Sequence, residues 1–155
     1  MNKLRVMFIC TGNTCRSPMA EVYFRNLCIQ NSLHQILVVS AGLSAIEGCS
    51  ASKMAQTTIE VAGLSLANFK STIVDDGAVR QASIVVGMTN EHARDIICLF
   101  PHSQNKTYTL LSFLGSSRDI QDPYGGSEGT FRECFDRMKP GLDALVDHVA
   151  SMLTT

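Results

Sequence analysis

Residues 8–21, FICTGNTCRSPMAE, join an apolar run to a helix-like segment through a short polar loop. The run KLRVMFI at 3–9 is apolar and partly β-branched, as is typical of a parallel strand that is buried on both faces. In the segment at 17–31, Ser17 is expected to be the helix N-cap, with Pro18 at the first helical position, where its missing N–H costs nothing. The stretch therefore predicts a strand, a tight loop and a helix.

The same alternation continues along the chain. Further strands are expected at 35–42, at 82–88 and within 106–114, and helices at 52–63 and 90–100. A last amphipathic helix is expected after Phe131, with a kink or break at Pro140 and Gly141. Strands that alternate with helices predict one α/β domain over residues 1–155, a four-stranded parallel sheet flanked by helices. Ligands of such sheets bind beyond the carboxyl ends of the strands.

Composition limits the function classes. The 155 residues are 45% hydrophobic and 17% charged with a net charge of -1, so nucleic acid and membrane surfaces are not expected partners. The basic start is followed by a short apolar run and then TGN, which does not resemble a signal peptide. The six cysteines are therefore expected to be reduced thiols of a cytoplasmic protein. No CxxC pair exists, and we expect neither a metal nor another cofactor.

The loop at 10–16, CTGNTCR, has the features of an anion site. It lies between a strand and a helix N-terminus, where free N–H groups and the positive end of the helix dipole gather. Gly12 and Asn13 tolerate unusual backbone angles, so the loop can turn successive N–H groups inward. Arg16 adds a two-pronged donor suited to phosphate oxygens.

A thiol stands at the centre of this loop. A cysteine beside an arginine at a helix N-terminus favours its thiolate form, so Cys10 is placed to attack phosphorus and carry the phosphoryl group. Ser17 can donate to the sulfur and improve it as a leaving group. The alternative interpretation is a buried structural cysteine in a strand-to-helix turn.

A thiolate nucleophile needs a proton donor for the group that it expels. The best candidate is Asp122, followed by Pro123 in a glycine-rich loop, although an Asp-Pro turn without catalytic function explains the residue equally well. Tyr124 is a candidate aromatic wall for the substrate. The segment at 40–48 follows the second strand, so Leu43 or Ile46 is also a candidate wall residue.

The motif CTGNTCRSPMAE after the first strand, with DPYGGS about thirty residues before the end, resembles the low-molecular-weight protein tyrosine phosphatase family. The resemblance covers the whole chain and implies that family's flavodoxin-like fold. It implies a metal-free mechanism with a cysteinyl-phosphate intermediate. In that mechanism Cys10 is the nucleophile and Arg16 binds phosphate. Asp122 protonates the leaving group and then activates water.

The resemblance also assigns the rest of the phosphate-binding loop: Thr11, Gly12, Asn13, Thr14, Cys15 and Ser17. Asn13 and Ser17 would brace it, and Asn68 stands near where relatives have a histidine that braces the asparagine. Cys15 would be the redox partner that forms a reversible disulfide with oxidised Cys10. The cysteines at 28, 49, 98 and 134 match no catalytic position and are expected to pack in the core. The implied partner is a phosphorylated protein, with the enzyme itself a monomer.

Thr14 and the segment GMTNEH at 87–92 resemble the protein-arginine phosphatase subgroup, since tyrosine-directed members usually have an aliphatic residue at the position of Thr14. A threonine hydroxyl suits a polar guanidinium, which favours phosphoarginine slightly over phosphotyrosine. A loop threonine also commonly bonds to the local backbone, so this choice stays open. Arsenate reduction on the same fold and a non-catalytic phosphate-binding module are the other hypotheses. The four histidines, His92 among them, have no ligand spacing and are interpreted as surface or helix-face residues.

Overall fold

Four parallel strands form the sheet of the computed structural model, which describes residues 3–154. The strands are β1 (Leu4–Cys10), β2 (Ile36–Gly42), β3 (Ile84–Gly87) and β4 (Thr107–Thr109), and their order is β2-β1-β3-β4. Strands β2, β3 and β4 lie within the predicted ranges, and β1 extends one residue beyond its predicted range, to Cys10. The next strand in the chain, β2, lies on one side of β1, and β3 lies on the other, so the strand order reverses at β1. Ligands of such sheets bind at this switch point, where the site is predicted.

Strand β1 is buried on both faces. It pairs with β2 from Leu4 opposite Ile36 to Cys10 opposite Gly42, and with β3 on its other edge. Its side chains alternate between two apolar clusters, as the period of a strand requires: Val6 and Phe8 join one, and Met7 and Ile9 the other.

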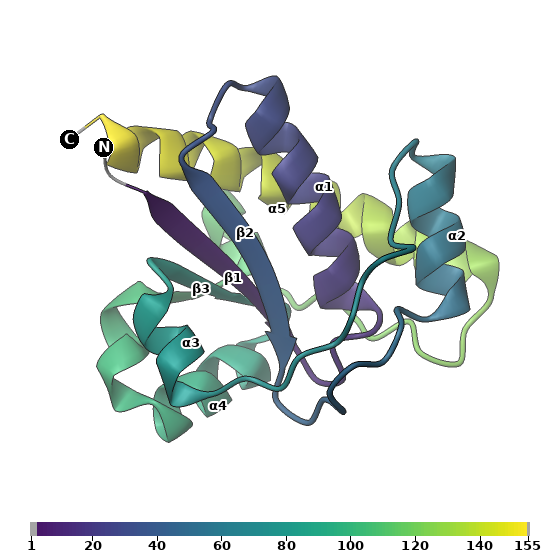
Figure 1. Ribbon diagram of the computed structural model, residues 1–155, viewed down its shortest axis with the longest axis horizontal. Helices are drawn as coiled ribbons and strands as arrows, with labels where there is room; N and C mark the ends of the chain where they lie inside the picture. Colours follow the sequence, from purple (N-terminus) through teal and green to yellow (C-terminus); the bar gives the residue numbers. More distant parts are fainter. Residues whose placement is uncertain (1–2, 155) are drawn as a thin grey trace.

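Helices cover both faces of the sheet (Figure 1). The larger cluster lies under α1 (Arg16–Gln30), α2 (Lys53–Val61) and α5 (Glu128–Leu153). The smaller cluster lies under α3 (Asp76–Gln81) and α4 (Asn90–Leu99). Two 3₁₀ turns, η1 (Pro101–Lys106) and η2 (Leu110–Leu114), flank β4. The arrangement is the predicted doubly wound α/β fold.

Of the kink or break expected at Pro140, the break does not occur, because α5 continues through this residue. A proline removes one backbone hydrogen bond, but Met138, Leu142 and Leu145 around it are fully buried and hold both halves on the core. Gly141 serves packing instead: a Cβ there would lie 3.0 Å from Leu110 Cγ and 3.1 Å from Leu110 O. The glycine therefore lets η2 approach α5 closely.

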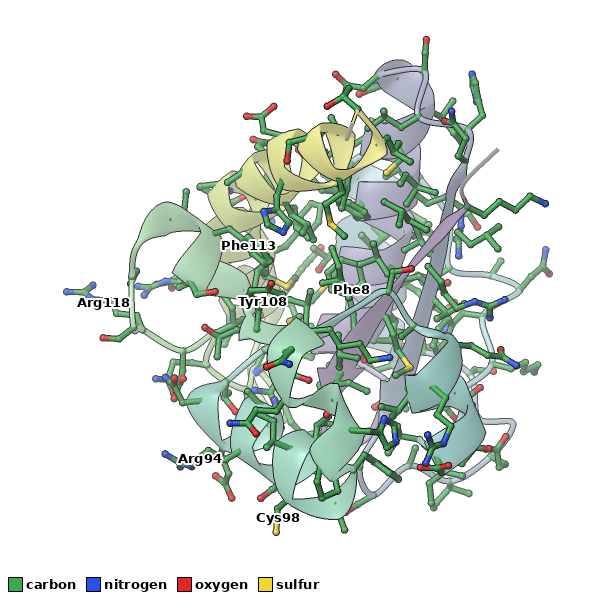
Figure 2. All side chains as sticks on the ribbon, turned by 90° about the vertical axis from the view of Figure 1, so that its left-hand side faces the viewer. Phe8, Arg94, Cys98, Tyr108, Phe113 and Arg118 are labelled. Atoms are coloured by element: carbon green, nitrogen blue, oxygen red, sulfur yellow. The ribbon has the colours of Figure 1, made fainter. Side chains whose placement is uncertain are left out.

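Smaller differences from the prediction concern two helices and two cysteines. Helix α1 begins at Arg16 with Cys15 at the N-cap position, so Ser17 is not its cap. Helix α3 was not expected from the sequence, since it is short and mostly polar. Cys98 is exposed and projects from α4 (Figure 2), so it does not pack in the core. Cys49 is half-buried, and Cys28 and Cys134 are buried as predicted.

Candidate active site

The loop between β1 and α1 lies at the carboxyl edge of the sheet and is held by the chain that follows β2. Leu43 N–H donates to Cys10 O (3.1 Å), Ser44 N–H to Thr11 O (2.9 Å) and Ser52 N–H to Thr14 O (2.9 Å). These bonds attach both ends of the loop to one neighbouring segment. The loop is therefore held in place before any ligand binds.

Asn13 is the internal support of the loop. It is fully buried and has a φ of 56°, in the left-handed region that asparagine tolerates. Its Nδ2 donates to Ser17 Oγ (2.8 Å) and Ser40 Oγ (2.9 Å), and its Oδ1 accepts from Thr72 N–H (2.8 Å). The expectation that Asn68 braces this residue is wrong, because Asn68 is exposed on another part of the surface. Only the fold brings Ser40 and Thr72 to Asn13.

The donors and acceptors in the hydrogen bonds of Asn13 can be assigned. Since Thr72 N–H faces the amide oxygen, the amide nitrogen of Asn13 sends its two hydrogens to Ser17 and Ser40. The Ser40 hydroxyl then donates to the Glu21 carboxylate at 2.7 Å. Ser17 accepts from Asn13, so its own hydrogen is free for the Cys10 sulfur 2.8 Å away. The Ser17 hydroxyl is thus placed to stabilise negative charge on the sulfur.

Arg16 and Asp122 meet across the site. The guanidinium is buried, donates to Ile120 O at 3.0 Å and lies 3.7 Å from Asp122 Oδ2. The other carboxylate oxygen, Oδ1, accepts from Tyr124 N–H at 3.0 Å. One carboxylate oxygen therefore closes a turn, as the non-catalytic interpretation expects, while the other faces Arg16 in the site. The Asp122 side chain is 53% exposed, open to an incoming group.

A cavity of about 220 Å³ joins the predicted site residues. It is lined by Cys10, Thr11, Gly12, Thr14, Cys15, Arg16, Asp122 and Tyr124. Tyr124 is 81% exposed at its rim, where a wall residue would stand. Leu43 is absent from the lining among the described residues, because its side chain packs on the smaller apolar cluster.

Cys15 shares this cavity with Cys10 but differs in environment. It is buried, and its Sγ donates to Ser52 Oγ at 3.4 Å. Burial raises the pKa of the Cys15 thiol above its ordinary value, against the opposing effect of its hydrogen bonds with Ser52 and Thr14. Cys15 is therefore held in the thiol form.

His92 is a site residue that sequence reasoning missed. It is 4% exposed rather than on the surface, and its Nε2 lies 3.0 Å from Thr11 Oγ1. Burial first, and the charge of Arg16 second, lower its pKa to about 4. A signal was present: His92 comes three residues after the N-cap Thr89, just beyond the end of β3 at the same edge of the sheet.

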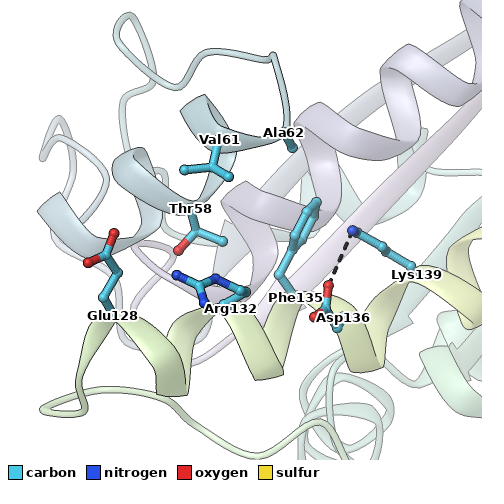
Figure 3. A pocket seen from close by; sticks show the side chains of 8 residues that line it. All are labelled: Thr58, Val61, Ala62, Glu128, Arg132, Phe135, Asp136 and Lys139. Atoms are coloured by element: carbon cyan, nitrogen blue, oxygen red, sulfur yellow. Dashed lines mark ion pairs between the residues drawn. The ribbon is translucent and has the colours of Figure 1, made fainter.

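A second cavity, of about 160 Å³, lies between α2 and α5 (Figure 3). Phe135 forms part of its floor, with Lys139 4.6 Å above the ring and 3.2 Å from Asp136. None of the loop residues lines it. Within residues 3–154, no cluster of three or more His, Cys, Asp or Glu side chains is arranged to hold a metal, and no helix has the length and apolar character needed to span a bilayer.

Comparison with known proteins identifies the family. The model of the low molecular weight phosphotyrosine protein phosphatases matches residues 5–154. The chain belongs to this family. It is 37% identical to a protein-arginine-phosphatase of Geobacillus stearothermophilus over 97% of both chains. It is 30% identical to the low molecular weight protein-tyrosine-phosphatase PtpB of Staphylococcus epidermidis, over 92% of this chain and 96% of that one.

The fold and the chemistry of this phosphatase also match a solved structure. That structure is a mutant of the arginine phosphatase YwlE with a phosphorylated active-site serine. It is similar with a TM-score of 0.90 and 30% identity, over 95% of this chain and 96% of that one. Phosphate bound covalently to the residue in the position of a nucleophile fits a mechanism with a cysteinyl-phosphate intermediate. The chain is thus an enzyme that hydrolyses phosphorylated protein side chains in two steps.

Proposed function

We propose that this phosphatase acts on phosphoarginine in proteins, with phosphotyrosine as the weaker substrate. The observation that carries the proposal is the hydrogen bonding of the Thr14 hydroxyl. Thr14 lines the cavity, and among the described residues its hydroxyl makes one side-chain hydrogen bond, a weak one of 3.8 Å with Cys15 Sγ. A threonine that served the local backbone would bond to it. The hydroxyl is therefore available to a polar substrate.

The first step transfers phosphate to sulfur. Cys10 Sγ attacks phosphorus, the S–P bond forms as the P–N bond of phosphoarginine breaks, and Asp122 protonates the departing nitrogen. Arg16 and the backbone N–H groups of the loop hold the phosphoryl oxygens. This assignment is supported by the cavity that the three side chains share and by the Ser17 hydroxyl, which lies 2.8 Å from the sulfur.

The second step releases phosphate. Asp122, now ionised, takes a proton from a water molecule while the oxygen of that water attacks phosphorus. The S–P bond then breaks and the thiolate is restored. Ser17, 2.8 Å from the sulfur, stabilises the charge that forms there. Tyr124 at the rim is the proposed wall for the substrate side chain.

Two supporting considerations concern the alternatives. The relatives that match over nearly the whole chain are named as phosphatases, so arsenate reduction is not favoured. The substrate class implied is a phosphorylated protein, and the enzyme is proposed to act on it as a monomer in the cytoplasm.

The test is phosphate release from matched phosphoarginine and phosphotyrosine peptides by the wild type, Thr14→Ile and Thr14→Ser. We expect the wild type to prefer phosphoarginine, Thr14→Ile to reverse the preference, and Thr14→Ser to keep it because the hydroxyl remains. A wild type that prefers phosphotyrosine would overturn the substrate assignment while leaving the two-step mechanism intact.

A further inference from the structure

We propose that His92 is a positioning residue that acts through Thr11, and that the two together form a polar wall selecting a guanidinium-borne phosphate. The inference rests on the proposed function and adds a second specificity element to Thr14. It starts from an unusual group: Nδ1 of His92 is buried and has no hydrogen-bond partner among the described residues. Buried polar atoms are nearly always paired, so this imidazole calls for an explanation.

The fold presses His92 toward the loop. Gly87 ends β3, and a Cβ on it would lie 3.0 Å from His92 Cβ and 3.0 Å from Ala93 N, so only glycine lets the first turn of α4 come this close. Thr89 caps that turn and accepts from His92 N–H at 3.0 Å. The imidazole is thus rigidly placed, with Nε2 3.0 Å from Thr11 Oγ1.

The unpaired nitrogen decides the tautomer. A buried N–H without an acceptor is more costly than a buried lone pair without a donor, so we assign the hydrogen to Nε2, where Thr11 accepts it. The ring is neutral for the same reason, since a charged imidazolium would carry an unpaired N–H at Nδ1. Burial and the charge of Arg16 favour the neutral ring too, against three carboxylates that oppose them, those of Asp95, Asp119 and Asp122.

This bond sets what Thr11 can offer. A hydroxyl has two lone pairs and one hydrogen, and His92 occupies one lone pair. The second lone pair and the hydrogen remain for a ligand. Thr11 is exposed and lines both the active-site cavity and an adjoining one of about 280 Å³ that His92 also lines. Arg16 and Asp122 are shared by the two cavities as well. Thr11 therefore lies where the two cavities adjoin, and we place the group that carries the phosphate beside its hydroxyl.

The chemistry of that group follows. A guanidinium has N–H donors that need acceptors, and the Thr11 hydroxyl and the Asp122 carboxylate both belong to residues that line the cavity. An aromatic ring offers nothing to this hydroxyl and would desolvate it without a partner. The fixed Thr11 thus favours phosphoarginine and disfavours phosphotyrosine. His92 contributes by keeping the hydroxyl from turning its acceptor side away.

The test compares kcat/KM for phosphoarginine and phosphotyrosine peptides in Thr11→Val, His92→Phe and the double variant. We expect Thr11→Val to lower the phosphoarginine-to-phosphotyrosine ratio about tenfold and His92→Phe to lower it between about threefold and tenfold. Because His92 acts only through Thr11, the double variant should match Thr11→Val within about twofold. His92→Gln, whose amide can donate in place of Nε2, should restore most of the ratio. His102→Phe is the control, since His102 is hydrogen-bonded to Asp76 and lines neither cavity, and it should leave the ratio unchanged.

Two results would overturn the inference. Equal losses for both peptides would show that His92 only supports the fold, and a double variant that falls by the product of the single effects would show that it acts independently of Thr11. If His92→Phe does not fold, the ¹⁵N shifts of His92 in the wild type decide, since a hydrogen on Nδ1 contradicts the assigned tautomer. The proposed function is judged separately, by the preference of the wild type alone.

Discussion

Gly42→Ala should damage the active site from thirty residues away. Gly42 ends β2 opposite Cys10, and a Cβ there would lie 2.7 Å from Thr11 O and 2.9 Å from Asn13 N. Both atoms belong to the backbone of the loop, so neither can rotate away. To restore an ordinary contact the loop must move by about 0.7 Å.

The magnitude follows from this clash. Overpacking of this kind costs about 3 kcal/mol, offset by about 1 kcal/mol from the stiffer unfolded chain. The net loss of about 2 kcal/mol should lower Tm by about 4–8 °C in a chain of this length. Because the shift falls on the groups that hold phosphate, kcat/KM should also fall by roughly tenfold to a hundredfold.

The assay is thermal unfolding followed by circular dichroism, together with hydrolysis of p-nitrophenyl phosphate. Gly77→Ala is the matched control, since its Cβ would meet nothing nearer than Asp75 Oδ1 at 3.6 Å, and it should hold or slightly raise Tm. If Gly42→Ala keeps both its Tm within about 1 °C and its activity within about twofold of the wild type, the close approach of β2 to the loop does not control the site.

Three further predictions concern single groups. Asp122→Asn should lower turnover much more for substrates with poor leaving groups than for p-nitrophenyl phosphate, because only the poor leaving groups need a proton. Equal losses in steady-state assays would show that Asp122 only forms the turn with Tyr124. Mild peroxide should produce a Cys10–Cys15 disulfide that thiols reverse, since both sulfurs line one cavity, and a peptide map without it would contradict the pairing. The folded protein should lose roughly 3 kcal/mol of stability as the pH falls from about 6.5 to 4. In this range His92 is protonated in the unfolded chain but stays neutral in the folded protein, where its pKa is lowered to about 4. Denaturant unfolding at several pH values checks this, and a His92→Gln variant with the same pH dependence as the wild type would refute it.

The sequence alone determined the fold class and the chemistry of the site. The alternation of apolar runs with amphipathic segments depends on local periodicity, which is readable without coordinates, and it predicted all four strands. Cys10 and Arg16 lie in one short loop, so their proximity followed from covalent spacing. Asp122 was selected because the chemistry requires an acid, but the sequence did not separate that function from a turn. In the structure one of its oxygens accepts from Tyr124 N–H and the other lies 3.7 Å from Arg16.

The supports of the site were decided only by tertiary structure, because they come from distant segments. Ser40 and Thr72 reach Asn13 through the pairing of β2 with β1 and the return of the chain beside it, a juxtaposition that no local pattern records. The same reason explains why the sequence position of Asn68 did not identify the residues that brace Asn13. The unbroken α5 shows the limit of propensity, since burial of its apolar face outweighs Pro140. His92 became a site residue when the parallel strands brought the ends of β1 and β3 to one edge, where packing, not sequence, set its contact with Thr11.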